Sequence, residues 1–190
     1  MVKGVVFNVL EDVVSDEHGE AVWDDLLAEA QVEGAYTAIG SYPDAEFVQL
    51  LRCLPGSQDA ALSETLRSFG RSAMGRLSGM YPAFFEPHDA TTPFLLTLND
   101  IIHPAVRCLY PGADVPIFDF TFPPVEDGSH LVVGYRSARQ LCHLAEGFID
   151  GAAAHFGERS QLRQSQCMQD GAPECLIVCT FTADGPRGQR

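Results

Sequence analysis

Three side chains in the pentapeptide Tyr135-Arg136-Ser137-Ala138-Arg139 form a pattern suited to binding an anion. A phenol, a hydroxyl and a guanidinium stand at alternate positions just after an apolar segment, and a guanidinium can bind a carboxylate through two hydrogen bonds. Far upstream, His103 lies beside apolar residues, where a neutral imidazole can bind a metal. A ligand with a metal at its centre and carboxylates on its rim would satisfy both features, and haem is such a ligand.

This combination resembles a known family. His103 followed by Tyr135, Ser137 and Arg139 is similar to the pattern of the H-NOX family of haem-based nitric oxide and oxygen sensors. The resemblance implies a haem b cofactor, with His103 as the axial ligand of the iron and the other three residues holding the propionates. A lone histidine is usually an ordinary core residue, so the prediction depends on the order and spacing of the whole set.

Other parts of the chain match the same family. Residues 3–8 and Pro116 are among them, and the resemblance extends over about residues 2–181. In this family the matching proline presses on the porphyrin and distorts it, which is the role implied for Pro116. A proline that precedes a strand is also simply a permitted strand terminus, and that alternative stays open.

The side chains opposite the axial histidine decide which gas is bound. In family members that hold oxygen stably, a tyrosine occupies the position of Leu144, and the positions of Val6 and Leu10 complete the same wall. Bound oxygen acquires partial negative charge and needs a hydrogen-bond donor, whereas nitric oxide and carbon monoxide do not. Three aliphatic residues therefore favour a nitric oxide sensor.

The resemblance places the chain with the stand-alone bacterial type and the nitric oxide-sensing subgroup. It implies that the protein is a sensor, not an enzyme, and that its state passes to a partner. The implied partner is a histidine kinase of a two-component system, or a diguanylate cyclase or phosphodiesterase that acts on cyclic-di-GMP. Two alternatives remain: an oxygen-binding haem protein, and a zinc or thiol redox sensor that uses the carboxyl-terminal cysteines.

Those cysteines carry a second signal. Cys142, Cys167 and Cys175 match positions that bind a structural zinc in some relatives, but Gln164 stands where those relatives have the fourth ligand, a histidine. Glutamine is a poor zinc ligand. Either Cys179 completes a tetrahedral thiolate site or no metal binds. If no metal binds, the cysteines are inert buried thiols or a redox-active pair.

Composition limits the class of protein. The chain has 190 residues, of which 46% are hydrophobic and 20% charged, and this predicts one globular domain over residues 1–182 with a flexible tail at 183–190. A formal charge of −14 disfavours nucleic acid and anionic membrane surfaces as partners. Six scattered cysteines in a chain with an ample core suggest reduced thiols in the cytoplasm. We see neither a targeting segment nor an apolar run long enough to span a membrane.

Hydrophobic periodicity predicts the fold class. Apolar residues at helical spacing predict helices over residues 2–19, 20–30, 43–51 and 57–80, the last interrupted near Gly70 or Gly75. A further helix should carry His103, with Asn99 or Asp100 as its N-cap, and should end at Tyr110. Strands follow at 116–122 and 129–135, then a long helix at 138–155 and strands at 161–166 and 176–181.

Helices followed by an antiparallel sheet define an α+β fold. We expect an amino-terminal helical subdomain and a carboxyl-terminal antiparallel sheet with a long helix, with the haem buried between them. Arg139 should lie in the first turn of that helix, where backbone N–H groups also favour anions. The remaining histidines, His143 among them, show no evident carboxylate partner at a recognisable spacing.

Overall fold

The computed structural model of the chain describes residues 1–57, 60–122 and 130–184. Short strands and helices make up the first half of the chain. In order they are β1 (Val2–Lys3), α1 (Gly4–His18), α2 (Glu20–Ala30), β2 (Ser41–Tyr42), α3 (Asp44–Arg52), α4 (Leu62–Met80) and the 3₁₀ turn η1 (Pro82–Phe84).

The second half contains the sheet and the helices that border it. Its helical segments are α5 (Thr91–Leu96), the π-helix η2 (Leu98–Ile102), α6 (His103–Leu109), α7 (Cys142–His155) and the 3₁₀ turn η3 (Met168–Asp170). Its strands are β3 (Ile117–Thr121), β4 (His130–Arg136), β5 (Glu158–Gln166) and β6 (Cys175–Ala183). The α+β expectation is confirmed. Among the described helices, none is both long enough and apolar enough to cross a lipid bilayer.

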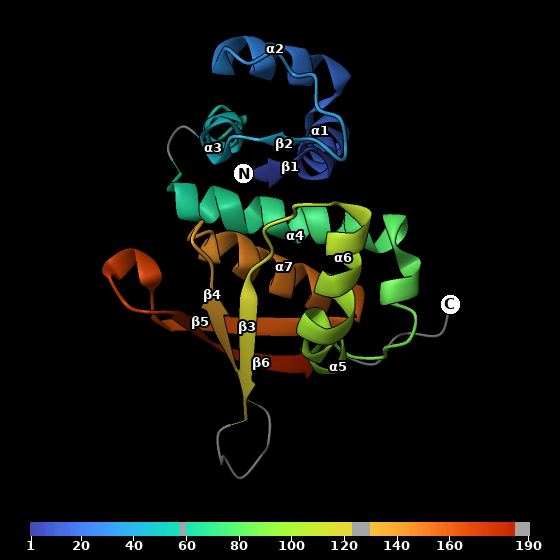
Figure 1. Cartoon of the computed structure of the whole chain (residues 1–190), viewed down its shortest axis with the longest axis vertical. Coiled ribbons are helices and arrows are strands. Elements are labelled where there is room, and N and C mark those ends of the chain that lie inside the picture. The colour runs from blue at the N-terminus through green and yellow to red at the C-terminus, as the bar shows by residue number, and fades with distance from the viewer. Residues whose placement is uncertain (58–59, 123–129, 185–190) are drawn as a thin grey trace.

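The helices of the first half form because their apolar residues recur on one face. In α1, Phe7, Leu10 and Val14 are all buried although the helix is rich in β-branched valine. Valine has a low helix propensity, but burial of a continuous apolar stripe outweighs that small cost. Figure 1 shows α1, α2 and α3 on one side of α4, with α7 and the sheet on the other side.

The four larger strands form one antiparallel sheet in the order β3-β4-β6-β5. Phe118 of β3 lies opposite Tyr135 of β4, which in turn lies opposite Cys175 of β6. Burial alternates along β6, as expected for a strand with one face against a core. The helix α7 packs against this sheet, so the residues at the carboxyl-terminal end of β4 are held close to the beginning of α7.

Two clusters of buried side chains lie on either side of α7. The amino-terminal core includes Phe7, Leu10 and Phe47, and Leu144 of α7 belongs to it. The carboxyl-terminal core joins α5, α7 and the sheet, and Ile149 belongs to it. Because α7 supplies side chains to both clusters, it forms the shared wall between the helical subdomain and the sheet.

The helices α4 and α7 approach each other closely at glycines. A Cβ atom added at Gly147 would lie 2.2 Å from the backbone oxygen of Arg67, and one added at Gly70 would lie 2.6 Å from that of Leu144. Both distances are far inside van der Waals contact with backbone atoms. These glycines are therefore needed because the two backbones are nearly in contact.

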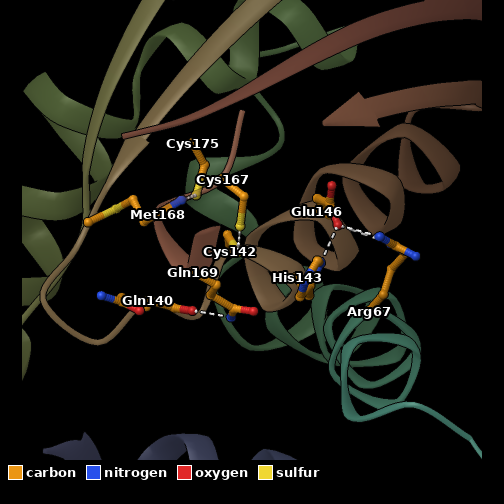
Figure 2. Close-up of polar contacts among 9 residues, drawn as sticks. All are labelled: Arg67, Gln140, Cys142, His143, Glu146, Cys167, Met168, Gln169 and Cys175. Carbon is orange, nitrogen blue, oxygen red and sulfur yellow. Dashed lines mark hydrogen bonds and ion pairs between the residues drawn. The ribbon is translucent and has the colours of Figure 1, made fainter. Parts of the chain in front are cut away.

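A buried charge lies at the same crossing (Figure 2). Glu146 of α7 is 1% exposed, and its Oε2 accepts hydrogen bonds from Arg67 Nη2 at 2.5 Å and Nε at 3.2 Å. The Nδ1 atom of His143 lies 3.0 Å from the same oxygen. The expectation that His143 has no carboxylate partner was therefore wrong, because the helix places residues three apart on one face.

The structure corrects two predictions about helix boundaries. The helix α4 is continuous through Gly70 and Gly75, because packing against α7 compensates for the low helix propensity of glycine at Gly70. Asn99 and Asp100 do not cap the helix of His103 but lie inside η2, which runs directly into α6. The predicted end of that helix at Tyr110 is confirmed.

A third correction concerns the residues around Arg139. The helix α7 begins at Cys142, so Arg139 lies in the preceding turn and not in the first turn of the helix. The predicted strands are all present, although β5 begins at Glu158 and β6 extends to Ala183. Ser129, the predicted start of β4, and residues 185–190 of the predicted tail lie outside the described residues.

The close crossing predicts opposite effects for two glycine substitutions. Gly147→Ala should lower the free energy of unfolding by about 1–3 kcal/mol, because the added methyl group forces α4 and α7 apart. Gly75→Ala is the matched control, since nothing lies within 4 Å of its Cβ position in the described residues. It should raise stability by about 0.5–1 kcal/mol through helix propensity. Chemical denaturation measures both, and equal effects would contradict the packing argument.

Candidate functional site

The side chain of His103 is buried at the start of α6. The residue is 9% exposed, and its Nδ1 atom has no hydrogen-bond partner among the described residues. Its ring lies 5.7 Å from that of Phe118, measured between centroids. The π-helix η2 immediately before it is an uncommon element that often occurs at functional sites.

The surroundings of His103 keep its imidazole neutral. Burial lowers its pKa to about 4, the nearby charge of Arg107 acts in the same direction, and the backbone of Pro116 opposes them. A neutral imidazole with an unused ring nitrogen is the form that binds metal ions. The backbone of Pro116, the residue expected to press on the porphyrin, therefore lies beside His103.

Tyr135 is joined to this region through Phe118. Its ring centroid lies 5.8 Å from that of Phe118, so Phe118 contacts both Tyr135 and His103. Tyr135 is 3% exposed. Burial raises its pKa to about 12, while Ser137 and Arg139 act to lower it. The side chains of Ser137 and Arg139 therefore lie near the Tyr135 phenol.

Arg139 is already paired with a carboxylate that the sequence analysis did not identify. Its Nε donates to Asp44 Oδ1 at 2.7 Å, and Asp44 Oδ2 accepts from the amino terminus of Met1 at 2.7 Å. Burial acts to raise the pKa of Asp44, but the amino terminus and Arg139 together lower it below its usual value. The backbone N–H of Arg139 also donates to Ser137 Oγ at 3.2 Å.

Asp44 was missed because the pairing spans most of the chain. Its position at the beginning of α3 suggested only a helix start, and no local spacing relates it to Arg139. The contact nevertheless places a carboxylate next to the guanidinium. Arg139 can therefore bind carboxylates here, and an incoming anion would share it with Asp44.

The predicted wall opposite His103 is aliphatic. Leu10 and Leu144 are buried in the amino-terminal core, and Val6 packs against the same core. Leu144 comes from α7, whereas the other two come from α1, so this wall exists only when the helices have packed. Hydrocarbon side chains cannot donate hydrogen bonds to a ligand beside them.

Three of the predicted cysteines meet at the start of α7 (Figure 2). The sulfur atoms of Cys142, Cys167 and Cys175 all lie within 4.8 Å of one another. The Sγ atoms of Cys142 and Cys167 are 3.8 Å apart. The backbone N–H of Met168 donates to Cys175 Sγ at 3.2 Å. Burial raises the pKa of the Cys142 thiol to about 12, an effect that Gln164 opposes.

Cys179 is not a member of this cluster. Its sulfur lies in the carboxyl-terminal core and points to the backbone oxygen of Ile177 at 3.6 Å. Burial and the charge of Glu146 raise its pKa to about 12. The expectation that Cys179 completes a four-thiolate zinc site was therefore wrong, because it lies on β6 beyond the reach of the other three sulfurs.

The chemistry of the donor set fits a haem. A buried imidazole with an unpartnered nitrogen can bind iron, and Tyr135, Ser137 and Arg139 offer donors to carboxylates. The apolar side chains of both cores can contact a porphyrin ring. The fold and these residues define a haem-binding gas-sensor domain. A family model described as Haem-NO-binding matches residues 3–164, and the chain belongs to this family, also called H-NOX.

Solved structures of H-NOX proteins share the whole fold. An H-NOX protein from S. oneidensis in the Fe(II)NO state is 27% identical, with a TM-score of 0.86 over 95% of this chain and 99% of that chain. The Shewanella oneidensis domain in the Fe(II)CO state is also 27% identical, with a TM-score of 0.83 and the same coverage. The H-NOX from Shewanella woodyi is 28% identical, with a TM-score of 0.77 over 100% and 99% of the two chains.

The lowered pKa of His103 predicts a pH dependence of stability in the haem-free protein. The unfolded state takes up a proton near pH 6.5 and the folded state only near pH 4, so the unfolded state binds more protons in that window. Stability should therefore fall as the pH decreases from 6.5 to 4. His103→Leu should remove this contribution, so the difference in unfolding free energy between variant and wild type should change only within that window. A constant difference would contradict the prediction.

Proposed function

We propose that this protein senses nitric oxide through a haem bound between the helical subdomain and the sheet, and that residues 1–182 act as one sensing domain. The observation that supports this most directly is His103, a buried neutral imidazole with an unpartnered nitrogen in a chain of the haem-NO-binding family. When bound, the haem would supply a ferrous iron that takes up small gases. His103 would be its axial ligand.

The remaining site residues would hold and orient the cofactor. Tyr135, Ser137 and Arg139 would donate to the propionates, and Arg139 would then divide its hydrogen bonds between a propionate and Asp44. Pro116, whose backbone contacts the imidazole, would lie against the porphyrin. His103, Pro116 and the motif at residues 135–139 come from three different parts of the chain, so correct folding is required for binding.

The aliphatic side chains expected opposite His103 would decide which gas the haem binds. Val6, Leu10 and Leu144 offer no hydrogen-bond donor, so a ligand that needs one gains no stabilisation beside them. Nitric oxide and carbon monoxide need none. In support, the S. oneidensis relatives have been solved with these two gases. An oxygen-binding haem protein is the alternative that the experiment below would reveal.

Two sets of variants test this proposal. His103→Gly should lose most of its haem and recover it when imidazole is supplied. In the wild type, the absorption spectrum of the reduced protein should change with nitric oxide and carbon monoxide but show no stable oxygen complex in air. Leu144→Tyr should permit oxygen binding by adding a donor, whereas Leu144→Phe, which has the same ring without the hydroxyl, should not. A stable oxygen complex in the wild type would overturn the nitric oxide assignment.

We also propose that the sensor state passes to a separate signalling protein. The family suggests a histidine kinase, or a diguanylate cyclase or phosphodiesterase for cyclic-di-GMP. A kinase or cyclase assay with and without nitric oxide would test this directly. If a partner binds the sensor but its activity does not change with nitric oxide, the sensor transmits a different signal.

The cysteine cluster supports a second candidate, a bound zinc ion. Cys142, Cys167 and Cys175 lie close enough for one ion to contact all three sulfurs, and the fourth position would be open or filled by water. Metal binding requires thiolates, so it must overcome the raised pKa values of the buried Cys142 and Cys175 thiols.

Zinc content should depend on the three clustered thiols together. Cys175→Ser should abolish stoichiometric zinc, because it leaves only two thiolates, whereas Cys179→Ser should leave the zinc content unchanged and serves as the matched control. Elemental analysis of the purified variants measures both. Full zinc content in Cys175→Ser, or no zinc in the wild type, would remove the proposal.

A further inference from the structure

The side-chain amide of Asn99 is bonded to both backbone groups of Phe118. Its Nδ2 donates to the Phe118 carbonyl at 2.5 Å, and the Phe118 N–H donates to its Oδ1 at 3.2 Å. Phe118 lies on β3, an edge strand of the sheet, and its other neighbour is Tyr135 of β4. The amide therefore takes the place of the next strand and satisfies groups that would otherwise be unpaired.

This contact joins the two segments that surround His103. Asn99 lies in η2, which leads directly into the helix that begins at His103. On the other side, the ring of Phe118 and the backbone of Pro116 both contact the imidazole. The amide thus ties the helix that carries the histidine to the strand that the histidine touches.

We infer that Asn99 is a positioning residue that sets the orientation of His103 relative to Pro116 and Phe118. A planar amide with two hydrogen bonds to one residue fixes both the distance and the direction between η2 and β3. The Asn99 amide does not itself bond the imidazole. It bonds the backbone of Phe118 and so acts on His103 through the backbone of η2 and β3. The inference rests on the proposed role of His103 as the axial ligand.

The test compares Asn99→Leu with Gln49→Leu. Both replace an amide by a similar-sized hydrocarbon, and Gln49 donates to the Ala30 carbonyl at 2.8 Å, outside the site. Asn99→Leu should release haem to an acceptor protein roughly fivefold to tenfold faster than the wild type, as expected for lost hydrogen bonds. It should also shift the iron–histidine stretching frequency in the reduced protein. Gln49→Leu should do neither.

A measurement without haem tests the contact itself. In the haem-free protein, the Phe118 amide proton should exchange with solvent roughly fivefold faster in Asn99→Leu than in the wild type or Gln49→Leu. If Asn99→Leu does not fold, Asn99→Asp is the second variant. It keeps the acceptor for the Phe118 N–H and loses the donor, so its effects should have the same direction.

A double variant separates this inference from the proposed function. In His103→Gly supplied with imidazole, the ligand is no longer attached to η2, so adding Asn99→Leu should not change haem loss further. An undiminished effect in that background, or a single variant that behaves like Gln49→Leu, would overturn the positioning role. Unchanged haem binding in His103→Gly without imidazole would instead overturn the proposed function, whatever Asn99 does.

Discussion

The packing of α4 on α7 is the constraint on which the rest of the structure depends. The backbones nearly touch at Gly70 and Gly147, so no larger side chain fits between them. This crossing makes α7 a wall with a different core on each side. Leu144 consequently faces the amino-terminal helices while Ile149 faces the sheet. Because α7 belongs to both cores, a shift of this helix would change the packing on both of its sides.

The buried charge at this crossing gives it a defined register. Glu146 is almost fully enclosed and needs both Arg67 and His143 to compensate for its desolvation. Sliding α4 along α7 would separate Arg67 from Glu146 and leave the buried carboxylate without its cationic partner from α4, which is costly. Close packing at glycines and a buried charge therefore act together: the first sets the distance between the helices and the second sets their alignment.

The binding site is assembled from segments that are distant in the chain. Phe118 contacts both His103 and Tyr135, so the candidate metal ligand and the candidate anion-binding motif share one aromatic ring. Asp44 pairs with both Arg139 and the amino terminus. One carboxylate therefore faces two positive charges, so these pairs do not fully compensate the positive charge beside the motif. Carboxylates of a ligand would enter a network that already joins the helical subdomain to the turn before α7.

Local pattern and motif were sufficient for some features and insufficient for others. Periodicity predicted the longer helices, the four strands of the larger sheet and the α+β class, but not α5, β1 or β2. The motif predicted the haem-binding family. Each of these predictions depends on residues whose spacing along the chain is itself the signal. The partners Asp44 of Arg139 and Asn99 of Phe118, and the separation of Cys179 from the other cysteines, were decided only by the tertiary structure. Such contacts depend on where distant segments meet, and that is set by the packing of whole helices and strands, which no local spacing records.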